Sequence, residues 1–430
     1  MSPSHRDSLP SLAGADWLAW PGTRKVFATI GTQGFDIRAV GGAVRDALLS
    51  RRVQDVDFAT TAGPETVMEL ARDAGLKVIA TGLDHGTVTV VAGGRAFEVT
   101  TLRKDVETYG RRAKVSYTDD WLADARRRDF TINALYADAD GTLHDPLGVI
   151  GDVAARHIRF IGDPRERVRE DYLRILRFFR FNAQLGDGDF DAAALDACVS
   201  ARAGLQGLSA ERVNSEMMRL LRAPGAAEAL RKMFEYGLLV QVLAGVPFLG
   251  RLEKLIAVEA HLGQEPDAVL RLGALAVAVA EDAARLTGRL RLSNADGKRL
   301  EEASRFHGLT PDMDDAGVRA GIHAVGRSGC RDRALMAWAA SQDMASDTRW
   351  RDLVTRIGEA PAPKFPLLGA DIVGMGVPQG PAVGEILGEI ETRWIAGGFA
   401  LGRAKLLDMA RGLVASRSGG TCQEMERERK

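Results

Sequence analysis

Residues 38–57 read Arg-Ala-Val-Gly-Gly-Ala-Val-Arg-Asp-Ala-Leu-Leu-Ser-Arg-Arg-Val-Gln-Asp-Val-Asp, and the order of residue types in this stretch decides the fold. An apolar run ends at Val40, a glycine pair and a helix-like segment follow, and two aspartates close the stretch. This order predicts a strand, a glycine turn, a short helix and a second strand. Gly41 and Gly42 let backbone N–H groups approach a phosphate closely, and a helix N-terminus favours negative charge. Arg45 lies on the first turn of that helix, where it is placed to reach the same anion.

The two aspartates that close the stretch are two residues apart. In an extended strand such side chains point the same way, so Asp55 and Asp57 should project together while Val56 faces the core. Neighbouring carboxylates repel each other unless a cation lies between them, and hard oxygen ligands beside a triphosphate suit Mg²⁺. An Asp-x-Asp motif alone is more often an ordinary acidic strand end. The glycine pair at a fixed distance before it favours the metal site.

Length and composition indicate an ordinary globular protein with more than one domain. The chain has 430 residues, whereas single hydrophobic cores stop growing at roughly 250–300 residues. No stretch approaches the ~20 apolar residues of a membrane span, and residues 1–10 lack the apolar core of a secretory signal. Cys198, Cys330 and Cys422 are odd in number and far apart, which argues against a disulfide framework or a metal cluster. We therefore expect a reducing, cytoplasmic location.

Charge is distributed unevenly along the chain. The net charge of −1 argues against a protein that binds nucleic acid through a strongly basic surface overall. Residues 156–180, however, contain eight arginines against four acidic residues, and Arg126, Arg127 and Arg128 form a further cluster. Such a local basic face can supply phosphate contacts, although a solvated helix with paired charges is the plain alternative.

The pattern of apolar residues changes near residue 151. Residues 34–150 alternate short β-rich runs with helical segments, whereas the later sequence is rich in Ala, Leu, Arg and Glu with apolar residues three or four apart. Residues 1–20 read as a loose arm with two tryptophans, followed by a helix that packs on the sheet. The expected division is an arm and helix (1–33), an α/β head (34–150), a helical neck (151–210), a helical body (211–300), a helical tail (301–415) and a disordered end (416–430).

The glycine pair and the two aspartates together resemble the nucleotidyltransferase superfamily that includes polymerase-β-like enzymes. This resemblance implies a third carboxylate in a hydrophobic-acidic-hydrophobic setting on a later strand, and Phe97-Glu98-Val99 fits that place. It also implies an α+β fold, with a polymerase-β-like head followed by an all-α neck, body and tail.

Residues 127–135, Arg-Arg-Asp-Phe-Thr-Ile-Asn-Ala-Leu, resemble the second motif of class II tRNA nucleotidyltransferases and bacterial poly(A) polymerases. The resemblance implies that Arg128 contacts the triphosphate and that Asp129 accepts a hydrogen bond from the ribose 2′-OH. Residues 145–148 are similar to the connector that leaves the catalytic domain. Residues 209–216 are similar to a later helical motif that braces the preceding helix.

The stretch 166–181 carries the most specific resemblance. Asp171, Arg174 and Arg177 are three residues apart, so on one helix they share a face. A surface helix laced with ion pairs is the plain interpretation, but the stretch resembles the family's amino-acid template for the incoming base. Asp171 would accept from the base amine and Arg174 would donate to the ring nitrogen, a pattern that cytosine and adenine share and that uracil and guanine reverse. Arg177 and Arg180 match further arginines that hold base and phosphates.

Two segments favour the CCA-adding branch over the poly(A) polymerase branch. Residues 81–89 are similar to the CCA-adding sequence, and the polar segment 106–124 has the place and length of the flexible loop that switches from C to A. We therefore expect a template-independent enzyme that adds C, C and A to the tRNA 3′ end. Poly(A) addition, partial addition of CC or A, and a catalytically silent RNA-binding relative are the alternatives.

The expected reaction is attack of the 3′-hydroxyl on the α-phosphate. The resemblance implies that Asp55 and Asp57 hold two Mg²⁺ ions and that Glu98 assists on the nucleophile side. The expected partners are the 3′ end and acceptor arm of tRNA, with CTP and ATP as substrates and no membrane or obligatory protein partner. The tail is expected to contact tRNA.

Overall fold

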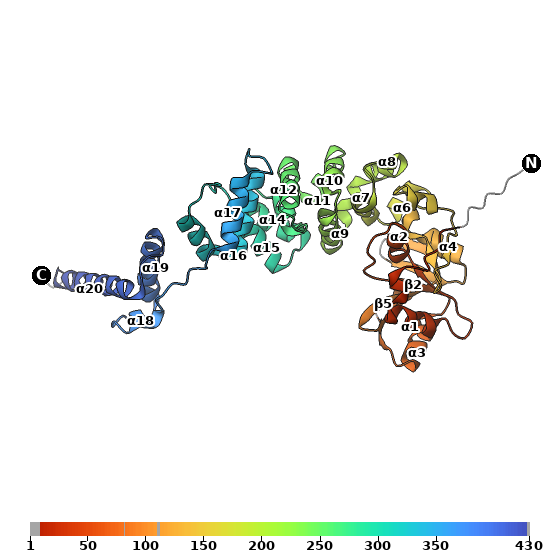
Figure 1. Ribbon diagram of the computed structural model, residues 1–430, viewed down its shortest axis with the longest axis horizontal. Helices are drawn as coiled ribbons and strands as arrows, with labels where there is room; N and C mark the ends of the chain where they lie inside the picture. The colour runs from red at the N-terminus through yellow and green to blue at the C-terminus, as the bar shows by residue number, and fades with distance from the viewer. Residues whose placement is uncertain (1–8, 81, 110–111, 428–430) are drawn as a thin grey trace, which may run out of the picture. The chain divides into compact units, whose positions relative to one another are not determined.

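The computed structural model describes residues 9–80, 82–109 and 112–427. The chain divides into two compact units, on either side of the link between Pro247 and Phe248. Among the described residues the strands all belong to the first unit, and the second unit is helical (Figure 1). The predicted α+β fold is confirmed, whereas the finer division into neck, body and tail stays a prediction.

The head contains a seven-stranded mixed sheet with the strand order β3-β4-β5-β2-β1-β8-β9. Strand β2 pairs antiparallel with β1 and parallel with β5, so the predicted aspartate strand lies between the strand before the glycine turn and the strand that carries Glu98. The strands are β1 (Ile37–Val40), β2 (Asp57–Thr60), β3 (Lys77–Ile79), β4 (Thr87–Ala92), β5 (Arg95–Thr101), β8 (Tyr136–Ala137) and β9 (Leu143–His144).

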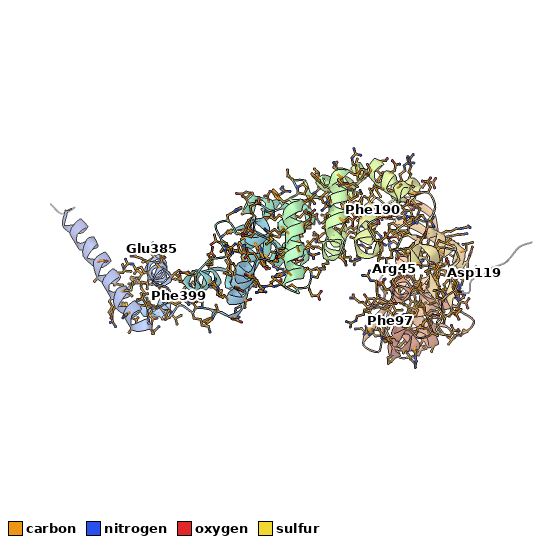
Figure 2. All side chains as sticks on the ribbon, turned by 45° about the horizontal axis from the view of Figure 1, so that its top comes forward. Arg45, Phe97, Asp119, Phe190, Glu385 and Phe399 are labelled. Carbon is orange, nitrogen blue, oxygen red and sulfur yellow. The ribbon has the colours of Figure 1, made fainter. Side chains whose placement is uncertain are left out.

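Helices cover the head sheet and close its core (Figure 1). They are α1 (Pro21–Ile30), α2 (Gly42–Leu48), α3 (Pro64–Asp73) and α4 (Trp121–Arg127), with short 3-10 helices η1 (Asp16–Ala19), η2 (Leu83–His85) and η3 (Thr131–Asn133). Phe27 on α1 packs edge-to-face on Phe58 of β2, with ring centroids 4.9 Å apart, and Phe58 also contacts Phe97. Figure 2 labels Phe97 in the head. These aromatic contacts bury the face of β2 opposite to its carboxylates.

The described part of the N-terminal arm, residues 9–20, is attached to the head, which corrects the expectation of a loose arm. Trp17 is buried, and the Arg95 guanidinium lies 4.0 Å from the centre of the Trp20 ring. The Leu12 N–H donates to the Gly141 carbonyl at 2.9 Å. Burial of the large Trp17 side chain and the contact of the half-buried Trp20 ring with Arg95 explain the attachment, because they remove apolar surface from water. Residues 1–8 lie outside the described residues.

Most of the described part of segment 106–124 is strand or helix, and only residues 118–120 form a loop there. Strands β6 (Arg103–Tyr109) and β7 (Arg112–Tyr117) form a two-stranded antiparallel sheet with an irregularity between residues 105 and 107, and α4 follows. Alternating β-branched and aromatic residues favour strands here despite the high polarity of the segment. Residues 110 and 111, in the middle of the predicted switch loop, and residue 81, in the sequence that favours the CCA-adding branch, lie outside the described residues.

The remaining helices of the first unit are α5 (Ile150–Ala154), α6 (Pro164–Glu170), α7 (Leu173–Leu185), α8 (Ala192–Ser200), η4 (Arg202–Gly207), α9 (Ala210–Arg222), α10 (Ala226–Glu235) and α11 (Leu238–Leu243). The continuous helix expected through Asp171 is wrong, because the backbone of Asp171 is extended, with φ −155° and ψ 107°, between α6 and α7. The Asp171 carboxylate accepts from the Leu173 N–H at 3.1 Å, a local hydrogen bond that starts a new helix.

The second unit holds α12 (Leu249–His261), α13 (Ala268–Ala276), α14 (Ala280–Leu290), α15 (Asn294–Ser304), α16 (Asp315–Ala340), α17 (Thr348–Glu359), α18 (Gly369–Val373), α19 (Pro381–Ala396) and α20 (Arg403–Arg427). One core of this unit contains the stacked Trp338 and Trp350, and another contains Trp394 with Phe399 against it (Figure 2). No helix among the described residues is both long and apolar enough to span a membrane.

Helix α20 also overturns the expectation of disorder after residue 416, because it continues to Arg427. Its last five residues, 423–427, are the good helix formers Gln, Glu, Met, Glu and Arg, whereas the preceding residues 418–422 include two glycines and favour a helix less. Residues 428–430 lie outside the described residues.

Candidate functional site

A cavity of about 1090 Å³ lies within the first unit, between the head sheet and helices α7 and α9. Ten arginines and five aspartates line it, so its wall carries an excess of positive charge that suits a polyanionic ligand. Eleven of the twelve residues predicted for the site contribute to this wall, namely Gly41, Gly42, Arg45, Asp55, Asp57, Arg128, Asp129, Asp171, Arg174, Arg177 and Arg180. Glu98 is not among the lining residues.

The acidic edge of the cavity is formed by Asp55 and Asp57. Asp55 precedes β2 and Asp57 begins it, yet the two carboxylates are exposed while Val56 between them is 1% exposed. The predicted alternation therefore holds, although only Asp57 belongs to the strand. Phe58 pairs with Val99 of β5, which places Asp57 and Glu98 at the same level of neighbouring strands.

These carboxylates crowd one another. Desolvation raises the pKa of Asp57 to about 6, and the negative charges of Glu98 and Asp55 add to the increase while Arg128 opposes it. Such a site favours any cation that relieves the repulsion. No group of three His, Cys, Asp or Glu side chains within the described ranges could enclose a metal by itself. The donor set therefore fits a divalent ion of the Mg²⁺ kind, which commonly takes one or two carboxylates and completes its shell with substrate phosphates and water.

The glycine turn needs glycine at one position. Gly41 has φ 71° and ψ −118°, a combination that side chains with a Cβ rarely adopt. The turn leads into α2, where the Arg45 guanidinium donates to Asn133 Oδ1 at 2.6 Å and to Asp46 Oδ1 at 2.9 Å. Arg45 is only 9% exposed, so these two bonds fix its direction at the cavity wall.

Asp124 anchors the two arginines that enter the cavity from α4. Its buried carboxylate accepts from Arg127 Nε at 2.8 Å, from Arg128 Nη2 at 2.9 Å and from the Tyr136 hydroxyl at 2.8 Å. Burial alone would raise the pKa of Asp124, but the charges of Arg128 and Arg127 outweigh it and lower the pKa to about 2. The Asp124 charge in turn raises the pKa of Arg128 despite burial. Arg128 is thus held as a fixed cation.

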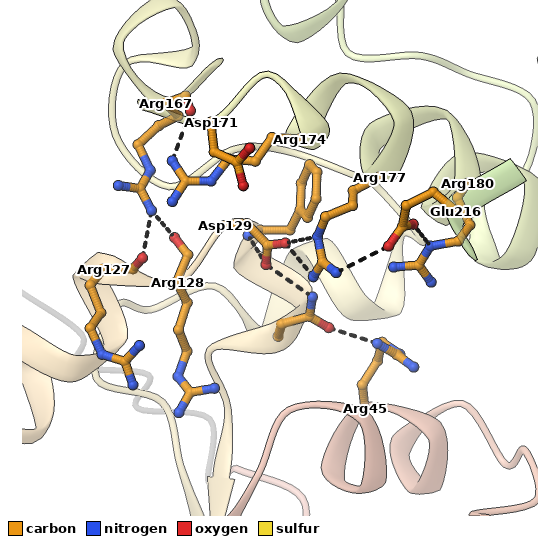
Figure 3. Close-up of polar contacts among 12 residues, drawn as sticks. Arg45, Arg127, Arg128, Asp129, Arg167, Asp171, Arg174, Arg177, Arg180 and Glu216 are labelled. Carbon is orange, nitrogen blue, oxygen red and sulfur yellow. Dashed lines mark hydrogen bonds and ion pairs between the residues drawn. The ribbon is translucent and has the colours of Figure 1, made fainter. Parts of the chain in front are cut away.

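Asp129 connects the head to helix α7. One oxygen accepts from Arg177 Nε at 2.6 Å, and the other accepts from Asn133 Nδ2 at 3.3 Å (Figure 3). Burial opposes ionisation, yet the Arg177 charge holds the pKa of Asp129 below its ordinary value. Because Asn133 also accepts from Arg45, a single amide links the anion-facing arginine to this carboxylate.

The predicted base template has internal partners. Asp171 faces Arg212 of α9, with Oδ2 2.6 Å from Nη2, and Arg174 forms an ion pair with Glu170 while donating to the Arg167 carbonyl at 2.7 Å. Asp171 therefore does not share a helix face with Arg174 as the sequence suggested. Both side chains still line the same cavity, and Arg212 sets the orientation of the carboxylate.

Two further arginines tie the elements around the cavity together. Arg167 donates to the carbonyls of Arg127 and Arg128, both at 2.6 Å (Figure 3). Arg180 forms a buried ion pair with Glu216 of α9 at 2.5 Å. Together with the Arg212 pair, this bond shows how α9 braces α7, as residues 209–216 suggested.

Several residues of the site escaped the sequence prediction, namely Asp46, Asp124, Asn133, Arg167, Glu170, Arg212 and Glu216. Asp46, Asn133, Arg167 and Glu170 lie within the quoted motifs but had been given no role there, and the structure shows that they contact the predicted residues. The only signal for Asp124 was its spacing of three and four residues from Arg127 and Arg128, which is also common on exposed helices.

Comparisons with known proteins agree with this architecture. Residues 37–159 match the poly A polymerase head domain, and residues 189–249 match a probable RNA and SrmB-binding site of polymerase A. The mitochondrial CCA tRNA nucleotidyltransferase 1 of Mus musculus is 32% identical over 406 residues, covering 90% of this chain and 89% of that one. A CCA-adding enzyme from a Geobacillus strain is 41% identical over 215 residues, covering 50% of this chain and 52% of its own.

The solved structures point the same way. The Bacillus stearothermophilus CCA-adding enzyme in complex with CTP superposes with a TM-score of 0.73 at 27% identity, covering 96% of this chain and all of the other. The Thermotoga maritima CCA-adding enzyme complexed with tRNA shares the fold with a TM-score of 0.63 at 18% identity, covering 91% of this chain and 94% of its own. The family is generally dependent on divalent metal. The length and identity of the match to the mouse enzyme show that this chain belongs to the family of CCA-adding tRNA nucleotidyltransferases.

Proposed function

We propose that this chain adds C, C and A to the 3′ end of tRNA, with CTP and ATP as substrates and pyrophosphate as the second product. The observation that carries the proposal is one cavity whose wall combines an acidic edge, a glycine turn and a base-facing Asp–Arg set. The relatives named above act on tRNA, and one of them binds CTP. No template strand is required, because the protein's own side chains line the place of the base.

The triphosphate and ribose are held by groups whose directions are already fixed. Gly41 and Gly42 allow close approach of the phosphates, and Arg45 and Arg128 present cations that buried carboxylate or amide partners keep in place. Asp129 is ionised and can accept the ribose 2′-OH, which favours ribonucleotides over deoxyribonucleotides. Fixed donors of this kind cost no reorganisation when the substrate binds.

The base is read by Asp171 and Arg174. Asp171 accepts from the amine and Arg174 donates to the adjacent ring nitrogen of cytosine or adenine, whereas uracil or guanine would leave buried groups unpaired at roughly 1–3 kcal/mol each. Arg177 and Arg180 lie on the next two turns of α7, where they can contact base and phosphates.

The acidic edge holds the metal. We propose that Asp55 and Asp57 bind two Mg²⁺ ions, which supply positive charge to the attacking and the leaving oxygen. The 3′-oxygen of the tRNA bonds to the α-phosphorus, the bond from that phosphorus to the bridging oxygen breaks, and pyrophosphate leaves. Glu98 lies beside Asp57 but outside the cavity wall, so its expected role is to support the acidic edge on the nucleophile side.

Poly(A) addition is not favoured, because the similar curated proteins are CCA enzymes. The hairpin β6–β7 occupies the place of the expected switch loop, and we propose that it serves the change from C to A. We also propose that the tail contacts tRNA and that the protein acts in the cytoplasm, while the relatives include mitochondrial and bacterial enzymes.

The test is incorporation with purified full-length protein, Mg²⁺ and tRNA transcripts that end at the discriminator base, at C, or at CC. We expect C on the first two transcripts, A on the third, and no growth beyond CCA. Continued addition of A would identify a poly(A) polymerase, and activity on only some of the transcripts would identify a partial CC- or A-adding enzyme.

A further inference from the structure

The ten arginines that line the cavity fall into two groups. Seven form an ion pair with a carboxylate of the protein, namely Arg45, Arg127, Arg128, Arg174, Arg177, Arg180 and Arg212. Arg51, Arg52 and Arg219 have no carboxylate partner among the described residues, and all three are exposed. We call these three the rim arginines. Their charge is not neutralised within the protein, so it is available to an external anion.

The rim arginines lie where the C-terminal end of α7 meets the head. Arg51 donates to the Gln184 carbonyl at 2.6 Å, and the side chain of the same glutamine accepts from Arg180 at 2.8 Å. Burial lowers the pKa of Arg180, and the nearby charge of Arg219 adds to that decrease, which places Arg219 at the same end. Arg52 follows Arg51 directly in the segment before β2.

This end is distant from the base template. Arg174 and Gln184 are ten residues apart on α7, which corresponds to about 15 Å along the helix axis at ~1.5 Å per residue. The phosphates of the nucleotide already have partners in the glycine turn and the paired arginines. In the proposed function the cavity therefore carries positive charge beyond that which binds the nucleotide, and this charge lies on exposed side chains.

Resting on the proposed function, we propose that the rim arginines bind the phosphodiester backbone of the RNA 3′ end and hold the terminal hydroxyl towards the acidic edge. Unpaired guanidinium groups suit this task because each makes bidentate contacts with a phosphate without reading a base. The RNA end changes as C, C and A are added, so contacts to the backbone serve every step. The β- and γ-phosphates of the nucleotide are the other possible source of the same chemistry.

The test compares one double-charge change with a single-charge control from the same helix, both in the full-length protein. Arg52→Gln with Arg219→Gln removes two rim charges, and Arg222→Gln removes an exposed charge from the same helix, α9, outside the cavity wall. Arg51→Gln is tested separately, since it also loses the bond to Gln184. Circular dichroism checks the fold of each variant. Binding of a tRNA transcript ending at the discriminator base is measured from 50 to 300 mM salt, and KM for CTP is measured at saturating tRNA.

We expect the double variant to bind the transcript at least about tenfold more weakly than the wild type. The slope of log affinity against log salt should become shallower by about 1.5, because each of two lost phosphate contacts contributes about 0.7–0.9. KM for CTP should change less than twofold, and Arg222→Gln should match the wild type. A rise in KM for CTP with unchanged tRNA binding would assign the rim to the triphosphate and overturn the proposal. Equal effects of the control and the double variant would also overturn it. If the wild type adds no nucleotide, the proposed function is contradicted. The binding comparison would still test whether the rim arginines contact the RNA backbone.

Discussion

Two regions of the cavity differ in how their charges are matched: the side lined by arginines, which we call the arginine wall, and the acidic edge formed by Asp55 and Asp57. On the arginine wall, most cations are matched by a carboxylate at hydrogen-bond distance, as Arg128 is by Asp124 and Arg177 is by Asp129. On the acidic edge, neither Asp55 nor Asp57 has an ion-pair partner among the described residues, and desolvation, with repulsion from Glu98 and Asp55, raises the pKa of Asp57. Apart from the three rim arginines, the cations of the cavity wall are therefore matched by carboxylates before any ligand binds, whereas the acidic edge has no matching charge until a cation binds.

This difference predicts which residues contribute to the stability of the fold and which contribute only to the reaction. Internally paired arginines contribute to the folded state and to substrate binding at once, so their loss should affect both. Crowded carboxylates oppose folding and serve only the reaction, so their loss should affect activity alone. Four substitutions or conditions test this contrast, from the largest expected effect to the smallest.

Asp57→Asn should lower nucleotide addition by about a thousandfold or more, equivalent to about 4 kcal/mol of transition-state stabilisation, because it removes a metal-binding carboxylate. Binding of tRNA should be nearly unchanged. The thermal midpoint in chelator should stay equal or rise, since a crowded charge is removed. Single-turnover incorporation and calorimetry measure both effects. Near-normal incorporation would refute the metal assignment, and a clearly lower midpoint would refute the contrast.

Asp124→Asn should have a mixed effect. Removing one partner of a buried ionic network costs about 3 kcal/mol of unfolding free energy, and loosening Arg128 should raise KM for CTP about tenfold. Tyr136→Phe is the control, because it keeps both ion pairs of Asp124 and removes only a hydroxyl, which donates to Asp124 at 2.8 Å and accepts from Arg128 Nε at 3.2 Å; it should cost about 1 kcal/mol. Urea denaturation and steady-state kinetics provide the readouts. If KM stays constant while stability falls, Asp124 has no part in orienting Arg128.

The pH dependence of stability should reveal the same network. The folded pKa of Asp124 is about 2 and its ordinary value is 3.8, so the unfolded chain binds more protons between these values. The contribution of Asp124 is therefore fully present above pH 4 and is lost as the pH falls towards 2, by about 2 kcal/mol. The stability difference between wild type and Asp124→Asn, measured in urea from pH 6 to pH 2.5, should shrink below pH 4. A difference independent of pH would contradict an ionised Asp124.

Asp171→Asn should have the smallest effect on rate and a specific effect on base choice. An amide can donate to the uracil O4, so the preference for CTP over UTP should fall about tenfold. Arg212→Lys keeps a cation beside Asp171 and should slow CTP and ATP addition alike without changing that preference. Single-nucleotide incorporation with each NTP measures the ratio. An unchanged preference would move the template away from Asp171.

The parts of the fold that follow from local chemistry could be predicted. The positive φ of Gly41 and the alternation around Val56 depend on neighbouring residues only, and they placed the turn and the acidic edge. The family motifs placed Arg128, Asp129 and Arg174 on one cavity although they are far apart in the chain.

The parts that depend on tertiary contacts could not be predicted. Asp124 looks like any acidic residue three or four positions before an arginine, and only its burial beside Tyr136 makes it an anchor. At the break, Asp171 has an extended backbone, and its carboxylate accepts from the N–H of Leu173, the first residue of α7. Residues 1–20 were expected to form a loose arm because nothing in their sequence indicates which surface the buried Trp17 covers.

The contact made by Arg167 has a consequence for how this site can change over evolutionary time. Its guanidinium holds the main-chain carbonyls of Arg127 and Arg128, and every amino acid presents the same carbonyl. Mutations of either side chain would leave this attachment between α6 and the head intact. Substrate preference can therefore drift at residues 127 and 128 without loosening the joint, whereas a single change at Arg167 would loosen it for every substrate.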